Sequence, residues 1–235
     1  MQEFNQSFGL AFGLIFGFDA DLLEIIALSL QVSLTAVVIA AIIGFPLGAT
    51  LAVIRFPGRQ VVDILLNALM GLPPVVVGLL VYMTVSRAGP LGWLNILYTP
   101  TAMIIAQVIL IVPIVAALTR QVIEDLHREY DEQFRSLCLP MKHVIPALIW
   151  DARYSLLTVV LAGFGRAIAE VGAVIIVGGN INHLTRMMTT AIALETSKGN
   201  LALALALGVV LMAMSLGINA LVYALRASAR HMAYA

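Results

Sequence analysis

The residues of greatest chemical interest are two opposite charges within an apolar stretch of the chain. Arg166 and Glu170 are the only charged residues between Tyr154 and Asn182. Placing either charge at the middle of a membrane costs at least about 2.5 kcal/mol. Their separation of four residues predicts that both lie on one face of a helix. The pair either orders neighbouring helices or lines the path of a solute, and the sequence leaves both interpretations open.

Patterns typical of enzymes are absent from the rest of the sequence. Neither Lys142 nor Lys198 follows a glycine, so the chain has no nucleotide-binding P-loop. The four histidines are scattered, and the HExxH and GxSxG signatures do not occur. Cys138 is the only cysteine, which excludes an intramolecular disulfide and a cysteine-based metal site. We therefore expect no catalytic residue, no metal site and no cofactor in this chain.

The composition is that of an integral membrane protein. Apolar residues make up 61% of the chain and charged residues 11%, whereas an ordinary soluble domain has about 25% charged residues. Such a sequence cannot cover a water-soluble enzyme with polar side chains. The 13 basic residues equal the 13 acidic residues in number and form no basic patch, which argues against binding to nucleic acid.

Apolar windows predict an all-α fold, a polytopic membrane bundle of about five helices. A helix needs roughly 20 predominantly apolar residues to cross the hydrocarbon. Residues 22–226 then form the transmembrane domain, between an apolar interfacial segment, 1–21, and a tail, 227–235. Phenylalanines recur every four residues in the first segment, and we interpret them as a structural stripe. The expected spans are about 24–54, 62–86, 101–120, 153–180 and 199–226.

The basic residues predict the orientation of the bundle. With these spans, nine Lys and Arg residues fall on one side of the membrane and three on the other. Because cytoplasmic loops carry the excess of positive charge, we expect the N-terminus outside and the C-terminus in the cytoplasm. The segment 120–153 is then the one substantial cytoplasmic feature.

Small residues and prolines predict close and irregular packing of the helices. A stripe of small residues at every fourth position lets another helix approach closely: Ala40, Gly44, Gly48 and Ala52. Prolines in or near the spans leave backbone carbonyls without their helical partner, and inside a membrane such carbonyls must face protein or water. These prolines are Pro46, Pro73, Pro74 and Pro113. Glycines that follow Glu170 predict that the fourth span breaks before it has crossed fully, as helices in transport pathways do.

The cytoplasmic segment 120–153 contains its own apolar pattern. Four residues recur at intervals of three and four: Phe134, Leu137, Cys138 and Met141. This spacing predicts a short helix with one apolar face that needs a partner surface. The alternative is a helical loop that packs on its own bundle, and the periodicity alone does not decide between the two.

Several runs in the second half of the chain resemble one family of transporters. They cover residues 163–173, 177–181, 185–186 and 189–197, and the first reads Gly-Phe-Gly-Arg-Ala-Ile-Ala-Glu-Val-Gly-Ala. The runs closely resemble the permease subunits of oxyanion ABC importers, nearest the tungstate permeases of the Tup type and next the molybdate permeases. The resemblance implies the type I ABC importer permease fold and a homodimer in the lipid of the inner membrane. Each permease would dock one ATPase subunit, which hydrolyses ATP, and the pair would share one periplasmic binding protein.

The resemblance also implies where the ATPase binds. The family carries an EAA signature in its cytoplasmic coupling helix, of which Glu132 and the run 135–137 remain, while Cys138 stands where a glycine is expected. Closure of the ATPases would push on this helix and rock the kinked spans. The residues expected in coupling are Glu132, Phe134, Arg135, Ser136, Leu137, Cys138 and Met141.

The expected gate and substrate follow from the same resemblance. Tungstate is the expected substrate, with molybdate or another oxyanion as the alternative. The residues expected in the gate or the translocation path are Arg166, Glu170, Gly172, Gly178, Gly179, Asn180, Thr185 and Arg186. Outer-loop side chains, joined by Arg186, are expected to offer neutral donors to a tetrahedral dianion: Asn180, Asn182, Thr185, Thr189 and Thr190.

Two other classes of protein stay open as alternatives. One is a channel or secondary transporter that works without ATP, and the other is a structural subunit of a larger membrane complex. A carrier driven by protons or sodium usually exposes an intramembrane carboxylate to its coupling ion. Here Arg166 stands one turn away from Glu170 and neutralises it, which favours the ABC importer.

Overall fold

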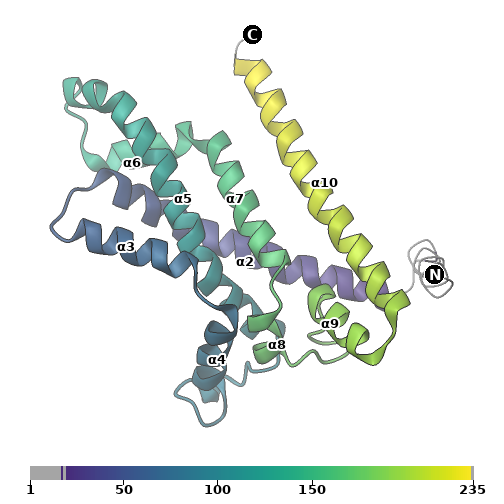
Figure 1. The fold of residues 1–235 in the computed structure, drawn as a ribbon. Coiled ribbons are helices and arrows are strands. Elements are labelled where there is room, and N and C mark those ends of the chain that lie inside the picture. The colour runs from purple at the N-terminus through teal and green to yellow at the C-terminus, as the bar shows by residue number, and fades with distance from the viewer. Residues whose placement is uncertain (1–16, 18–19, 234–235) are drawn as a thin grey trace. The chain divides into compact units, whose positions relative to one another are not determined.

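The computed structural model describes Gly17 and residues 20–233, with side chains up to residue 224, and the phenylalanine stripe of segment 1–21 lies outside them. All regular structure in the described residues is helical, which confirms the all-α class (Figure 1). The α-helices are α2 (Ala20–Val53), α3 (Arg59–Met70), α4 (Pro74–Val85), α5 (Pro100–Ser136), α6 (Met141–Asp151), α7 (Arg153–Ile168), α8 (Gly172–Gly178), α9 (Met188–Lys198) and α10 (Leu201–Ala233). A short 3-10 helix, η1 (Gly92–Leu94), lies between α4 and α5.

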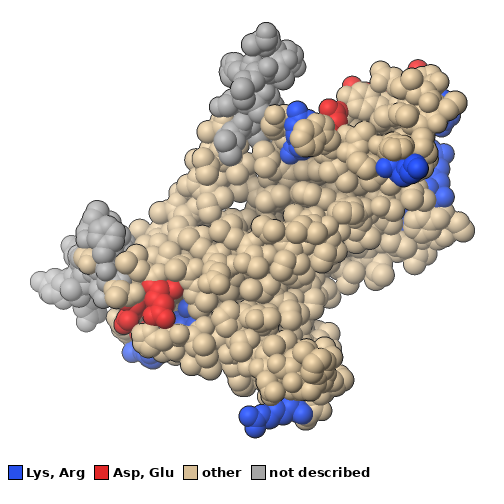
Figure 2. Space-filling view, turned by 180° about the vertical axis from the view of Figure 1, so that it is seen from behind, with Lys and Arg blue, Asp and Glu red and all other residues tan. Residues whose placement is uncertain are grey.

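Long apolar helices are the dominant feature of the described part of the chain. There, α2, α5 and α10 are each long and apolar enough to cross a membrane. The pairs α3 with α4 and α6 with α7 would raise the number of spans from three to five if each bent pair is one span. Figure 2 shows that most of the surface on the face drawn carries no charged side chain. Charges gather instead in a few separate patches.

Two of the expected spans are divided by breaks in the helix. The expected span 62–86 is split between α3 and α4, which differ in direction by 97°. Gly71 ends α3, and Pro73, in extended conformation, precedes α4, because a proline disfavours helical conformation in the residue before it. The expected span 153–180 is split between α7 and α8, so the predicted break occurs, but it begins at residue 169 rather than after Glu170.

The chain forms two compact units, each made from separate stretches of sequence. Unit 1 comprises residues up to Ala36 together with Pro73–Gln107 and Ala167–Ile218. Unit 2 comprises Val37–Leu72 and Val108–Arg166, with the chain from Asn219 onward. The long helices α2 and α5 each contribute one part to each unit.

Unit 1 depends on a close contact between α4 and α8. A Cβ atom at Gly78 would lie 2.7 Å from the Cα atom of Ala173, and a Cβ at Gly172 would lie 2.9 Å from the Cγ2 atom of Val75. Both distances are shorter than real side chains allow. Glycine at these two positions therefore lets the backbones of α4 and α8 approach.

Unit 2 depends on the predicted stripe of small residues, whose partner is α5. Ala40, Gly44, Gly48 and Ala52 are all buried. A Cβ atom at Gly44 would lie 2.7 Å from Cγ1 of Val115, and one at Gly48 would lie 2.8 Å from Cβ of Thr119. The prediction that another helix approaches this face closely is confirmed.

Charged side chains attach α3 to α5 within unit 2. The Arg59 guanidinium lies 3.3 Å from the Glu124 carboxylate, and that of Arg120 lies 3.3 Å from Asp63 and 3.1 Å from Glu124. The four side chains are mostly buried, with between 15% and 27% of their surface exposed. Because charges that lose water need partners, the network fixes the amphipathic α3 against α5.

The α2–α5 contact predicts the effect of one added methyl group. Gly48→Ala places a Cβ against the α5 backbone and Thr119, so we expect it to destabilise the protein by about 1–3 kcal/mol. The control is Gly208→Ala in α10, where a Cβ would meet no atom within 4 Å, and we expect it to be neutral or stabilising by up to about 1 kcal/mol. Thermal unfolding of the full chain in detergent measures both, and equal melting temperatures would contradict the close contact.

Candidate functional site

The first candidate region is the break between α7 and α8. Glu170 lies in this break and is 2% exposed. Its Oε1 atom accepts a hydrogen bond from the backbone N–H of Ala173 (3.0 Å), while its own carbonyl accepts one from the Thr189 hydroxyl (2.8 Å). These bonds satisfy backbone groups that the break would otherwise leave without partners. Glu170 thus caps α8.

The prediction that Arg166 and Glu170 lie on one face of a helix is wrong. Helix α7 ends at Ile168, so Glu170 lies beyond its end. Arg166 is half-buried in the last turn of α7, where a positive side chain complements the negative end of the helix dipole. The two residues differ in this way because the chain leaves the helical conformation at residues 169–171, before α8 begins in unit 1.

Gly178 and Gly179 occupy positions where a side chain would collide with a neighbour. Gly179 has φ +70°, in the left-handed region, and a Cβ there would lie 2.9 Å from Cδ1 of Tyr98. A Cβ at Gly178 would lie 2.9 Å from the Sδ atom of Met103. The backbone N–H of Tyr98 donates to the carbonyl of Val177 at 3.0 Å. The end of α8 is therefore fixed tightly to the segment that leads into α5.

The threonines of the outer loop are bonded within the protein. The buried Thr185 hydroxyl donates to the carbonyl of Gly178 (2.5 Å) and accepts from the N–H of Ile181 (3.0 Å). The Thr190 hydroxyl donates to the side-chain oxygen of Asn180 (3.0 Å). With the Thr189 bond to Glu170, these hydroxyls hold the loop in place. In this structure protein acceptors already use these hydroxyls, and their role as donors to a dianion stays a prediction.

Arg186 differs from those threonines. Its Nε atom is buried and has no hydrogen-bond acceptor among the described atoms. Its backbone N–H donates to the carbonyl of Ile181, which keeps the residue in the same tight loop. Of the residues predicted for the gate, Arg186 therefore combines a positive charge with a buried donor that has no acceptor in the described part of the chain.

His183 connects the outer loop to the beginning of α2. Its Nδ1 atom lies 2.7 Å from Oε2 of Glu24. This hydrogen bond, together with the charge of Glu24, raises the pKa of the exposed imidazole. Among the described residues, Asp21, Glu24 and His183 bring possible metal-ligand atoms within 4.8 Å of one another. All three are exposed, and exposed carboxylates at this spacing are common without a metal ion.

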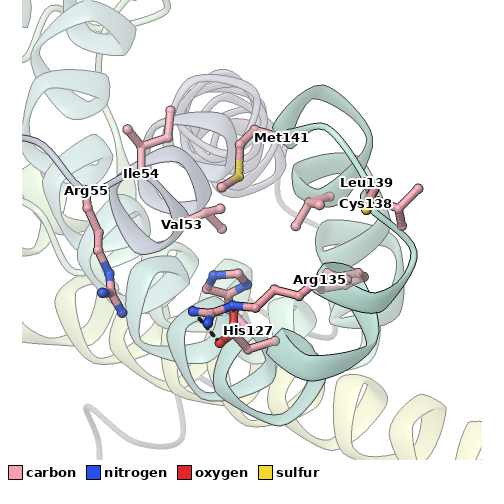
Figure 3. Close-up of a pocket in the computed structure, with 11 residues that line it drawn as sticks. Val53, Ile54, Arg55, His127, Arg135, Cys138, Leu139 and Met141 are labelled. Atoms are coloured by element: carbon pink, nitrogen blue, oxygen red, sulfur yellow. Dashed lines mark hydrogen bonds and ion pairs between the residues drawn. The ribbon is translucent and has the colours of Figure 1, made fainter.

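The second candidate region is a groove of about 500 Å³ in unit 2, which we name the α5–α6 groove. Figure 3 shows side chains from α2, α5 and α6 directed into the same space. The lining residues are Val53, Ile54, Arg55, His127, Asp131, Phe134, Arg135, Cys138, Leu139, Met141 and Val144. Phe134 stacks on His127 with ring centres 6.2 Å apart, and Tyr130 meets Phe134 edge-on at 6.0 Å. The groove thus has an aromatic wall beside the charged pair Asp131–Arg135 (2.9 Å).

The predicted short helix with one apolar face is also wrong in its bounds. Helix α5 continues to Ser136, a turn follows, and α6 begins at Met141. Cys138 in this turn has φ +49°, a left-handed conformation that favours glycine. Glycine is the residue that the family resemblance led us to expect at this position, and it adopts this conformation most readily. The turn, rather than one helical face, brings the apolar residues together.

The groove contains only part of the predicted coupling set. Phe134, Arg135, Cys138 and Met141 line it, whereas Glu132, Ser136 and Leu137 do not. The Ser136 hydroxyl donates to the Gln133 carbonyl (2.9 Å), Glu132 is exposed, and Leu137 is 66% exposed. Sequence reasoning did not predict that His127, Asp131 and the end of α2 also line the groove. The signal was present, because His127, Asp131 and Phe134 follow the helical intervals of four and three.

A hydrogen bond also joins α5 to α6. The Tyr130 hydroxyl donates to the carboxylate of Asp151 at 2.9 Å, and this bond raises the pKa of the phenol. Tyr130 belongs to α5 and Asp151 to the end of α6. The ends of the groove-forming helices are therefore held together outside the expected spans.

The sequence is similar to those of known membrane components of transport systems. A family model described as "Binding-protein-dependent transport system inner membrane component" matches residues 44–231. The chain is 41% identical over 226 residues to the tungstate uptake system permease protein TupB of Peptoclostridium acidaminophilum, covering 96% of this chain and 99% of that protein. It is 40% identical to a probable anion ABC transporter permease protein of Haloferax volcanii, covering 85% and 88%. A TupB protein of Campylobacter jejuni is 37% identical, covering 73% and 72%.

The His183–Glu24 contact predicts a pH-dependent stability. Because the folded-state pKa of His183 is raised, the contact contributes fully below the ordinary histidine pKa of 6.5 and is lost as pH rises through the raised value. We expect the melting temperature of the unmodified protein to exceed that of His183→Gln at low pH, with the difference shrinking at high pH. In a Glu24→Gln background, the His183→Gln change should no longer alter the melting temperature in a pH-dependent way. A difference in melting temperature between the unmodified protein and His183→Gln that stays constant with pH would contradict the ion pair.

Proposed function

Because the chain belongs to the family of inner membrane components of binding-protein-dependent transport systems, we propose that it is the membrane-spanning permease of an ATP-driven tungstate importer. The observation that supports tungstate as the substrate is the near full-length similarity of this chain to a tungstate uptake permease. Family membership confirms the resemblance stated from the sequence and the type I importer permease fold. The chain is accordingly a multi-pass inner membrane protein.

A permease of this kind works with partner proteins. An ABC importer requires an ATPase subunit and a binding protein that delivers the solute. The chain carries no P-loop, which supports hydrolysis of ATP on a separate subunit. We place the N-terminus outside and the C-terminus in the cytoplasm, as the distribution of basic residues favours. Two copies of the permease, surrounded by lipid, would form the pathway.

The α5–α6 groove and its turn form the proposed surface for the ATPase. Basic residues Arg55 and Arg135 line the groove, which agrees with a cytoplasmic position. Leu137 and Met141 are 66% and 50% exposed, so they present apolar area that an ATPase cleft would cover. The aromatic wall and the Tyr130–Asp151 bond would transmit the push of the ATPase to α5 and α6 together.

The proposed gate is the segment from Arg166 to Arg186. Three sets of contacts hold this segment in place: the α4–α8 contact through Gly78 and Gly172, the cap at Glu170 and the hydrogen-bonded loop after Gly179. A segment with internal bonds on both sides of α8 moves as one body rather than unravelling. Arg186, half-buried and positively charged, is the residue of the loop that we assign to contact with a passing anion.

Selection between oxyanions is assigned to the external binding protein. Tungstate and molybdate are both tetrahedral dianions, so a weak passage site hardly separates them. Weak binding also favours transport, since a site that held the ion tightly would slow its release. The alternatives are a molybdate or other oxyanion importer and, with less support, an ATP-independent channel or secondary transporter.

Uptake by the reconstituted complex tests the substrate. Vesicles that contain the permease, its ATPase and its own binding protein are expected to accumulate tungstate only when ATP is supplied. Replacing that binding protein with a molybdate-specific one that still docks should change the transported ion. Absence of tungstate uptake with the native partner would overturn the assignment, and uptake without ATP would favour a channel or secondary transporter.

A single substitution in the α5–α6 turn tests the ATPase surface. Leu137→Asp places a charge where an apolar contact is proposed, so we expect at least a tenfold loss of ATPase association, equivalent to about 1.4 kcal/mol or more. Membrane insertion should be unchanged, because Leu137 is exposed. The matched control is Leu91→Asp, an exposed leucine of the outer loop. Co-purification of the ATPase at the normal level with the first variant would remove this turn from the interface.

A further inference from the structure

A second groove in unit 2 lies on the other side of α6 and is almost wholly apolar. It measures about 480 Å³ and is formed by residues of α2, α6 and α7. Arg153 is the only charged residue in its lining. The lining residues are Phe45, Pro46, Ile145, Pro146, Ile149, Trp150, Arg153, Leu156, Leu157 and Val160. A long apolar groove with one positive charge at one end has the chemical pattern of a lipid-binding site.

The charge of Arg153 is held in a defined position. Its guanidinium lies 5.1 Å from the centre of the Trp150 ring and 4.5 Å from that of Tyr154. One N–H donates to the Trp150 carbonyl at 2.8 Å. Among the described residues, no carboxylate forms an ion pair with Arg153. A guanidinium has five N–H donors, so most of them remain for an external anion.

The groove extends from a charged boundary into the apolar part of the bundle. Arg153 directly precedes the charge-free run 154–165, and Val160 lies roughly 10 Å further along α7. On α2, Phe45 and Pro46 lie roughly 14 Å before Arg55, the first charge after that span. Trp150, 72% exposed, and Tyr154 are the residue types that gather at the membrane interface. This order of residues predicts that Arg153 lies at headgroup level, with the apolar lining at the level of acyl chains.

We propose that this groove is a binding site for an anionic phospholipid of the surrounding bilayer. The lipid phosphate binds the free N–H donors of Arg153, and one acyl chain lies along Leu156, Leu157 and Val160 toward Phe45. Charge complementarity selects this occupant over a zwitterionic lipid, whose own cation offsets its phosphate. The site is separate from the surface proposed for the ATPase, and it requires only that the chain lies in a membrane.

The two tryptophans of the chain permit a direct measurement. Trp93→Phe leaves Trp150, at the edge of the groove, as the only tryptophan. The full chain with this change is reconstituted in bilayers that contain brominated phosphatidylglycerol or brominated phosphatidylcholine, and quenching of Trp150 gives their relative association. We expect phosphatidylglycerol to be preferred by about fivefold, as one basic side chain near an anionic surface provides.

Two variants identify the group that binds the headgroup. Arg153→Gln should reduce the preference to about onefold, whereas Arg153→Lys should keep part of it. The matched control is Lys142→Gln, which removes an exposed basic residue of α6 that does not line the groove. We expect this control to retain the full preference.

The outcomes that overturn the proposal are distinct. Equal quenching by both lipids in the Trp93→Phe protein overturns it, and this comparison decides even if Arg153→Gln fails to fold. A preference that survives Arg153→Gln removes Arg153 from the site. Quenching by neither lipid means that protein covers the groove, and cross-linking between copies then shows whether a second permease is the occupant.

Discussion

Every backbone group freed inside an apolar bundle must find a partner within the protein, since hydrocarbon offers none. This constraint explains the region around α8. The break before it frees backbone donors and carbonyls, and Glu170, Thr185 and Thr189 satisfy several of them. Polar side chains that look suited to a substrate therefore serve the backbone. The same constraint explains why α8 needs glycine neighbours, because a short helix held this closely leaves no room for side chains.

Helix α6 connects two surfaces of different chemistry within unit 2. Its residues Met141 and Val144 line the α5–α6 groove, while Ile145 and Ile149 line the apolar groove with Arg153. Neighbouring positions on an α-helix point in different directions, so one short helix serves both. Any displacement of α6 changes both surfaces at once. Under the two proposals made above, the lipid and the ATPase would act on the same helix.

The sequence predicted the features that depend on composition and spacing. Apolar windows located the long helices α2, α5 and α10, and the small-residue stripe at Gly44 and Gly48 predicted a close helix contact. The partner of that stripe could not be predicted, because Val115 and Thr119 carry no signal that pairs them with it. The family resemblance, by contrast, predicted a glycine at position 138, and Cys138 there has the left-handed conformation that glycine adopts most readily.

The errors came from places where a helix stops without a glycine or proline at that point. The pattern of Phe134, Leu137 and Cys138 suits a helix, but α5 ends at Ser136, and α6 begins only at Met141, after Pro140. Similarly, the spacing of Arg166 and Glu170 suits one helical face, but α7 ends between them. Such ends are set by tertiary contacts, which local spacing does not contain.

The long-range bonds of unit 1 have a consequence for the biogenesis of the protein. The Ser29 hydroxyl accepts from the N–H of Met188, and Glu24 meets His183; each pair is separated by 159 residues. A ribosome needs about ten to thirty seconds to synthesise that length. Throughout this interval the nascent helix α2 lacks the segment that completes its polar contacts. Insertion factors and membrane proteases therefore meet this helix before its own fold can protect it.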